Sequence, residues 1–190
     1  MAGDMRRGDR AVSLTCSFPR MGRFIMGYVV RVLAALSLVL AAAFAHAAGS
    51  VAVLDFELRD LTLTPDTAEE RDKAARLAPL LRQALTSAGV NVVAVDPKQQ
   101  QAADKASGYL FDHDDAAAEL ARAAGADYVA VGRLHKPSPL FSYLMVQLIR
   151  SADARRVGEY VVEIKGQFEQ TATKGTRRLA EQIQQTLQSK

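Results

Sequence analysis

The fold is decided by residues 126–169, which read ADYVAVGRLHKPSPLFSYLMVQLIRSADARRVGEYVVEIKGQFE. Three β-rich segments follow one another here, at residues 126–136, 140–151 and 157–169. Pro137 and Pro139 force a bend after the first segment, and residues 152–156 form a hairpin turn after the second. Apolar and charged residues alternate along the last segment. This pattern predicts an antiparallel meander with one face exposed to water, at least at the edge of the sheet.

The segments upstream add a parallel part to this sheet. Residues 50–57 (SVAVLDFE) and 90–95 (VNVVAV) predict two further strands, the first of them largely buried. Helices are expected at residues 69–88, 97–107, 116–124 and 171–188, the last with the apolar stripe Leu179, Ile183 and Leu187. Right-handed crossovers place the first three strands parallel. The predicted fold class is therefore α/β: a two-layer sandwich with a mixed five-stranded sheet of order 2-1-3-4-5 and three to four helices mainly on one face.

Local signals mark the ends of the predicted helices. Gly89 and Gly125 each follow a helix, at the position where a glycine commonly ends one. Asp96 followed by Pro97 predicts an N-cap with proline at the first helical position. Asp114 or Asp115 is expected to cap the helix at residues 116–124.

Residues 21–47 predict a cleavable secretory signal peptide. Arg23 and Arg31 supply its positive flank, and residues 32–44 form an uncharged apolar run that is shorter than the roughly 20 residues of a membrane span. Cleavage is predicted after Ala47, with a cut after Ala45 as the near alternative and a retained membrane anchor as the rival interpretation. Since residues 1–20 fit no part of a signal, Met21 and Met26 are alternative starts to Met1. Residues 48–190 then form a single soluble α/β domain in the periplasm, without a further membrane span.

Removal of residues 1–47 changes what the composition implies. The whole chain has a net charge of +3, but six Lys/Arg and two acidic residues precede the predicted cut, so the remainder carries −1. The basic balance is therefore no evidence for binding nucleic acid. Cys16, the single cysteine of the sequence, is removed as well. The remaining domain has no disulfide, no thiol nucleophile and no thiolate metal site.

Two acidic groups are the first candidate ligand sites. Asp112, His113, Asp114 and Asp115 offer carboxylates and an imidazole for a divalent cation. Consecutive side chains point in different directions, however, so a helix cap with an acidic first turn is the favoured interpretation.

Asp55 and Glu57 form the second acidic group, on one side of the first strand near its carboxyl end, where α/β sheets usually bind ligands. An ion pair with a nearby arginine or a solvated strand end is the favoured interpretation here. A pocket that contains Asp55 together with His113 or His135 would instead favour a ligand site.

The remaining polar candidates are weaker. His135 lies near Ser138 and Ser142, but no nucleophile elbow or oxyanion signature surrounds them, so we expect a surface histidine. Gly125, Gly132 and Gly158 form no phosphate-binding loop. Two arginine pairs are expected to be solvated, with the second as a candidate contact for an acidic partner: Arg155 with Arg156, and Arg177 with Arg178. We assign no catalytic, cofactor-binding or metal-binding residue.

The segment at residues 140–151 is apolar on both of its sides. One alternating set contains Phe141, Tyr143, Met145 and Ile149, and the other contains Leu140, Leu144, Val146 and Leu148. A two-layer sandwich covers one face of its sheet, so the second set needs a cover from a partner, from the final helix, from the Pro137 loop or from a second copy of the chain. A flat apolar strip centred on Met145 would indicate a protein-binding surface.

Two stretches resemble a family of exported bacterial proteins, domain of unknown function 3280, also labelled 2380. They are residues 118–166, AELARAAGADYVAVGRLHKPSPLFSYLMVQLIRSADARRVGEYVVEIKG, and residues 51–59, VAVLDFELR. More distantly, the order of elements is similar to the N-terminal domain of TolB and to envelope lipoproteins of the LpoB and CsgG type. That resemblance implies an assembly or interaction module.

The sequence departs from the family pattern at two places. Members often carry a cysteine pair where residues 111–117 here read FDHDDAA, so a redox role of that pair cannot operate in this chain. The hairpin has Arg155 where a glycine is usual, so Arg155 or a neighbour must take a positive φ if the turn keeps its left-handed residue.

The predicted function is a non-enzymatic protein-interaction or assembly module of the periplasm, with an envelope protein as its partner. A homodimer is an open alternative for the partner. The alternative function is a small-ligand or metal-binding accessory protein, and a hydrolase is the least favoured interpretation.

Overall fold

The structure of the protein is a computed structural model that describes residues 49–106 and 108–189. The predicted signal peptide, its cleavage site after Ala47 and the alternative start residues lie outside the described residues. The strands are β1 Val51–Val53, β2 Glu57–Asp60, β3 Val92–Val93, β4 Tyr128–Lys136, β5 Phe141–Arg150 and β6 Arg155–Lys165. The helices are α2 Ala68–Ser87, α3 Pro97–Ala103, α4 Tyr109–Asp112, α5 Asp114–Ala123 and α6 Phe168–Gln188.

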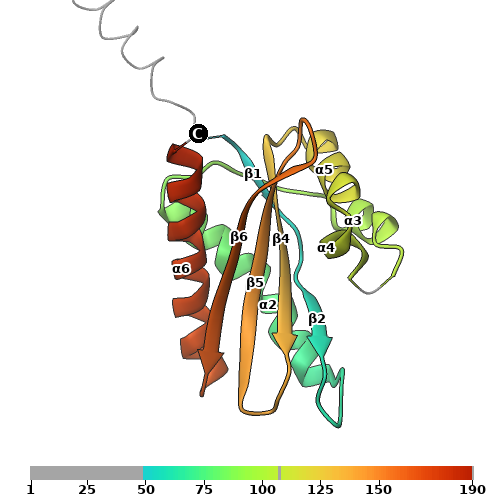
Figure 1. Cartoon of the computed structure of the whole chain (residues 1–190), viewed down its shortest axis with the longest axis vertical. Coiled ribbons are helices and arrows are strands. Elements are labelled where there is room, and N and C mark those ends of the chain that lie inside the picture. Colours follow the sequence, from blue (N-terminus) through green and yellow to red (C-terminus); the bar gives the residue numbers. More distant parts are fainter. Residues whose placement is uncertain (1–48, 107, 190) are drawn as a thin grey trace, which may run out of the picture. The chain divides into compact units, whose positions relative to one another are not determined.

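The strands form one mixed sheet, which confirms the predicted α/β class. Along its main path the order is β3-β1-β4-β5-β6, which corresponds to the predicted order 2-1-3-4-5. β1 pairs in parallel with β3 and β4, whereas β4, β5 and β6 pair antiparallel as the predicted meander (Figure 1).

The sheet of the described chain has six strands, because the first predicted strand is divided in two. β1 ends at Val53, and β2 resumes at Glu57 along the same side of β4. Between them the ring of Phe56 lies over Gly132 of β4, in the space that a Cβ atom would need at that position. The chain leaves the strand conformation to bring this ring onto β4, and Phe56 is buried as a result.

The two long helices cover one face of the sheet. α2 contributes Leu77, Leu81 and Leu85, all completely buried, and its N-cap Thr67 accepts a hydrogen bond from the backbone N–H of Glu70. α6 contributes the predicted stripe, which is confirmed because its three members lie in the same core cluster as β5 and β6: Leu179, Ile183 and Leu187. The sequence predicted three to four helices mainly on one face, but of the five described helices only α2 and α6 belong to this core.

A second, smaller helical layer covers part of the opposite face. Leu110 and Phe111 of α4 and several alanines of α5 pack on Leu54, Val131 and Ile149 of the sheet. The short helix α4 thus lies between the helices predicted at residues 97–107 and 116–124. Figure 1 shows α3, α4 and α5 grouped together on the side of the sheet away from α6, and the lower halves of β5 and β6 lie beyond this group.

Most of the predicted helix ends and the predicted turn are found in the structure. Asp96 caps α3 by accepting a hydrogen bond from the N–H of Lys98, and Gly125 after α5 takes a φ of +73°. The cap predicted for α5 was wrong, because His113 occupies the N-cap position and makes no side-chain cap bond. In the β5–β6 hairpin Ala154 has a φ of +54°, so a neighbour of Arg155 carries the left-handed conformation.

Candidate interaction surface

The two apolar sets of the fourth predicted strand meet different surroundings. Leu144, Val146 and Leu148 are completely buried under α2 and α6. Ile149, at the other face, is buried beneath α4 and α5. Leu140 was predicted inside the strand, but β5 begins at Phe141, and Leu140 lies exposed in the preceding turn. Part of the second set is therefore covered by helices, and part is not.

The uncovered part is a surface that we call the open face, formed by Phe141, Tyr143, Met145 and Val161. The first three side chains are half-buried, and Val161 is 52% exposed. Val161 pairs with Met145 across β5 and β6. Phe141 and Tyr143 meet edge to face, with ring centroids 5.8 Å apart. The open face is therefore a strip of aromatic, thioether and branched side chains at the position that the sequence predicted for a binding surface.

His135 borders the open face and makes no hydrogen bond to a nucleophile or a carboxylate among the described residues. Its ring lies 6.4 Å from that of Tyr143, with 22° between their planes. Burial lowers the pKa of His135, and the positive charges of Arg59 and Arg133 lower it further. Its Nδ1 is buried without a hydrogen-bond partner among the described residues. The predicted surface histidine is thus half-buried, and it contacts neither Ser138 nor Ser142 through a hydrogen bond that the structure shows.

Charged side chains along β6 limit the open face on its outer side. Lys165 pairs with Glu163 at 2.8 Å. Arg156 pairs with Asp114, the first residue of α5, at 2.9 Å. Arg59 on β2, beside His135, is exposed. The open face therefore has an apolar centre and a charged rim, which is the usual organisation of a protein interface.

The acidic residues around His113 do not converge. Asp112 lies 3.3 Å from Arg133, Asp114 pairs with Arg156, and the His113 ring stacks on Tyr109 with centroids 4.0 Å apart. Within the described residues, no group of three or more His, Cys, Asp or Glu side chains is arranged to hold a metal ion. The local geometry therefore favours ion pairs over a cation site.

The two carboxylates of the first predicted strand are separated by their ion pairs. Asp55 accepts a hydrogen bond from Arg82 of α2 at 2.9 Å, whereas Glu57 pairs with Arg133 of β4. Both residues line a pocket of about 380 Å³. Neither His113 nor His135 belongs to its lining, so the arrangement that would favour a ligand site is not formed.

Arg133 is a buried polar residue that was not predicted from the sequence. It is 7% exposed, and its guanidinium pairs with Glu57 and lies 3.8 Å from the centre of the Phe111 ring. Gly108, with a φ of +82°, leaves room for this pair, because a Cβ there would meet Glu57 Oε2 at 2.8 Å. Burial lowers the pKa of Arg133. The cluster joins β2, β4 and α4, and its contacts indicate a structural role.

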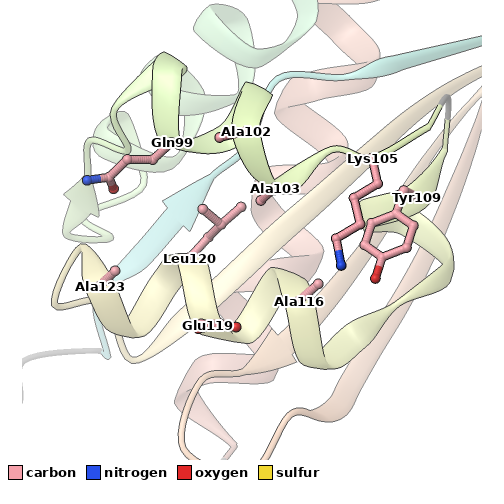
Figure 2. A pocket seen from close by; sticks show the side chains of 9 residues that line it. All are labelled: Gln99, Ala102, Ala103, Lys105, Tyr109, Ala116, Glu119, Leu120 and Ala123. Atoms are coloured by element: carbon pink, nitrogen blue, oxygen red, sulfur yellow. The ribbon is translucent and has the colours of Figure 1, made fainter.

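A second pocket lies between α3 and α5 (Figure 2). It measures about 410 Å³, and its walls are mainly alanines with Leu120. Lys105 and Tyr109 stand at one end, with the ammonium 5.2 Å from the ring centre. None of the polar candidates predicted from the sequence lines this pocket.

The other predicted candidates occupy structural or exposed positions. Gly132 and Gly158 are sites of close packing, against Phe56 and Tyr160 respectively. Arg155, Arg177 and Arg178 are exposed, as expected of solvated charges. In the described part of the chain no helix is both long and apolar enough to cross a membrane.

Sequence comparison identifies the family. The model of domain of unknown function 3280 (DUF3280), described as a protein of unknown function (DUF2380), matches residues 49–183. The chain belongs to this family. The match leaves out residues 1–48 and includes the open face and the Arg133 cluster of this DUF3280 chain. No curated protein matches the sequence.

Several solved structures have a similar backbone. The PelC dodecamer from Paraburkholderia phytofirmans is 19% identical over 74% of this chain and 91% of its own, with a TM-score of 0.48. The C-terminal domain of LpoB from Salmonella enterica is 18% identical over 68% of this chain and 92% of its own, with a TM-score of 0.44. The hypothetical protein CT253 from Chlamydia trachomatis is 9% identical over 75% of this chain and 99% of its own, with a TM-score of 0.48.

Proposed function

We propose that this DUF3280 protein is an exported, non-enzymatic interaction module of the cell envelope, whose protein partner binds the open face. The observation that carries the proposal is the uncovered half of the β4–β6 sheet. Elsewhere helices cover the sheet on one or both faces, yet Val161 remains 52% exposed beside Met145 and Tyr143. Apolar side chains of this kind are enriched in the core of protein interfaces.

The polar chemistry supports binding rather than catalysis. The acidic candidates Asp55, Glu57 and Asp114 each pair with an arginine. His135, the most suggestive base, has no carboxylate to orient it among its contacts. The export-signal pattern at residues 21–47 supports a periplasmic location for the partner.

The side chains of the open face indicate which groups the partner must present. Its contact surface presents apolar side chains that pack on Tyr143, Met145 and Val161. Arg59 at the rim is exposed, so a carboxylate on the partner fits opposite it. The interface is one between two proteins, and a second copy of the chain is the alternative occupant that the experiment distinguishes.

Site-specific photo-crosslinking in cells tests this proposal. A photo-reactive amino acid replaces Val161 in the complete chain, and a matched protein carries it at Gln185, an exposed position of α6. We expect position 161 to capture one defined envelope protein that position 185 does not capture. If position 161 captures a second copy of the chain instead, the open face is the interface of a homodimer.

Binding of the purified partner then completes the test. Val161→Asp introduces a charge into the open face and should weaken binding at least about tenfold, as for a central interface residue. Gln185→Glu adds the same charge on α6 and should leave the affinity unchanged. Equal affinities of Val161→Asp and the wild-type protein would refute the proposal.

A further inference from the structure

Three leucines stand out from one end of the sheet. In the described chain, the most exposed large apolar side chains are Leu63 at 103%, Leu140 at 81% and Leu61 at 58%. Their neighbours in sequence are mainly threonine, serine and proline. We call these three residues the leucine tip. A leucine whose side chain is wholly in water is unfavourable, so three of them together need an explanation.

The leucine tip is formed by two loops that follow the neighbouring strands β2 and β4. Leu61 and Leu63 belong to the loop between β2 and α2, and Leu140 belongs to the loop between β4 and β5. The backbone N–H of Leu61 donates to the carbonyl of Lys136 at 2.9 Å, which joins the first loop to the end of β4. Both loops lie at the lower end of the sheet in Figure 1, at the carboxyl ends of β2 and β4.

The leucine tip lies far from the end of the domain at which the described chain begins. β1 starts beside Tyr128, the first residue of β4, and β4 then extends nine residues toward the tip. Nine residues of strand span about 30 Å. Anything held at Gly49 is therefore well separated from the leucines.

The size and shape of the leucine tip favour a lipid surface over a protein partner. A leucine side chain carries roughly 100 Å² of apolar surface, so the three expose about 250 Å². A stable protein interface buries about 800 Å² on each side. The leucines also project outward, so a protein would have to supply a pocket for them. A bilayer accepts projecting apolar side chains without a preformed pocket.

The charges on the same elements are compatible with an anionic bilayer. Asp66 pairs with Arg71 at 3.2 Å, and Glu163 pairs with Lys165 at 2.8 Å. Glu70 lies between Lys73 and Lys136. Each of these carboxylates is paired with a lysine or an arginine, which reduces the repulsion between this end of the sheet and negatively charged headgroups.

From these observations we propose that the leucine tip inserts into the surface of a lipid bilayer and holds the protein there weakly and reversibly. Leu61, Leu63 and Leu140 enter the region between headgroups and acyl chains. The loop polar groups stay in the headgroup layer. Binding by three side chains without a second anchor is reversible. This leaves Met145 and Val161 of the open face, about 15 Å farther along β5 than Leu140, free for the protein partner.

Tryptophan fluorescence tests the insertion, because the chain contains no tryptophan. Leu63→Trp places a single fluorophore at the leucine tip, where no packing is disturbed. Val161→Trp is the matched control on the open face. Each full-length variant is mixed with vesicles of phosphatidylethanolamine and phosphatidylglycerol that contain dibrominated phosphatidylcholine. We expect a blue shift and quenching by the brominated lipid for Leu63→Trp, and neither for Val161→Trp.

A second set of variants measures the contribution of the other two leucines. In the Leu63→Trp background, Leu61→Ser and Leu140→Ser should each lower the vesicle partition coefficient by about tenfold. A membrane anchor retained near Gly49 would not produce quenching at position 63, because about 30 Å separate the two sites. The proposal is overturned if the Leu63→Trp emission is unchanged by vesicles, or if both tryptophans are quenched equally. A blue shift of the Leu63→Trp emission on addition of a protein, with no change on addition of vesicles, would also overturn the proposal.

Discussion

Loss of the buried cation at position 133 should destabilise the fold more than loss of the exposed carboxylate of Asp112 beside it. Arg133 is 7% exposed and pairs with Glu57, whose side chain is 14% exposed. Arg133→Met removes the cation and leaves the carboxylate of Glu57 without a partner in a largely dehydrated position. Breaking a buried pair in this way costs about 3–5 kcal/mol.

Features of the structure place the expected loss in the free energy of unfolding within this range. Glu57 borders the pocket of about 380 Å³, where water can reach part of the carboxylate, so we expect the lower end of the range. Methionine keeps an apolar side chain of similar length at this position but loses the guanidinium contact with the Phe111 ring. The contact with Asp112 is 3.3 Å long and its carboxylate is 59% exposed, so that contact contributes less than about 1 kcal/mol. The expected loss is about 3 kcal/mol in the free energy of unfolding.

Urea unfolding followed by circular dichroism measures this difference. Arg133→Met should lower the free energy of unfolding by about 3 kcal/mol, and Asp112→Asn by less than about 1 kcal/mol. The double variant Arg133→Met with Glu57→Leu removes both charges and should recover most of the loss. If the double variant is as unstable as the single one, unpaired charge is not the cause. A loss below about 1 kcal/mol for Arg133→Met would show that the pair is not buried in the way described.

Three further predictions concern packing, backbone conformation and pH. Gly132→Ala should destabilise the protein by about 1–3 kcal/mol in the same urea assay, because the new Cβ occupies the space of the Phe56 ring; an unchanged midpoint would show that the ring moves freely. Gly125→Ala should cost about 1 kcal/mol from its φ of +73° alone, since nothing lies within 4 Å of the added Cβ; a loss above about 3 kcal/mol would indicate an unrecognised packing conflict. Burial would raise the pKa of Glu70, but Lys136 and Lys73 outweigh it and hold that pKa below its ordinary 4.5. The stability from this charge is present above pH 4.5 and is lost as the pH falls through the lower pKa of the folded state. Glu70→Gln should therefore flatten the fall in stability below pH 4.5, measured by urea unfolding across that range, and an unchanged slope would contradict this assignment.

Local patterns were sufficient to predict the class and the main path of the sheet. The alternation in β6 and the stripe of Leu179, Ile183 and Leu187 each report which side of an element is buried, and both appear in the core. The division of β1 from β2 could not be predicted in this way. It depends on the packing of Phe56 against Gly132, and these two residues lie far apart in the sequence.

The open face could be predicted only in part, because its boundaries also depend on contacts between distant segments of the chain. Large residues on both sides of the segment at residues 140–151 indicated a face in need of a cover. Which of them would be covered depended on α4, whose residues 109–112 carry too short a pattern to be recognised as a helix. Arg133 was missed because a charged residue in a strand with a wet face is usually exposed. Its burial follows from Phe111 and Glu57, which come from two distant segments.

Binding of a protein partner to the open face is tested most directly by the affinity of Val161→Asp for that partner. Val161 is 52% exposed, so this substitution should leave the free energy of unfolding within about 1 kcal/mol of the wild-type value. We expect at least a tenfold loss of affinity, of the size found for central interface residues, with Gln185→Glu unchanged. An affinity of Val161→Asp equal to that of the wild-type protein would show that the partner binds elsewhere.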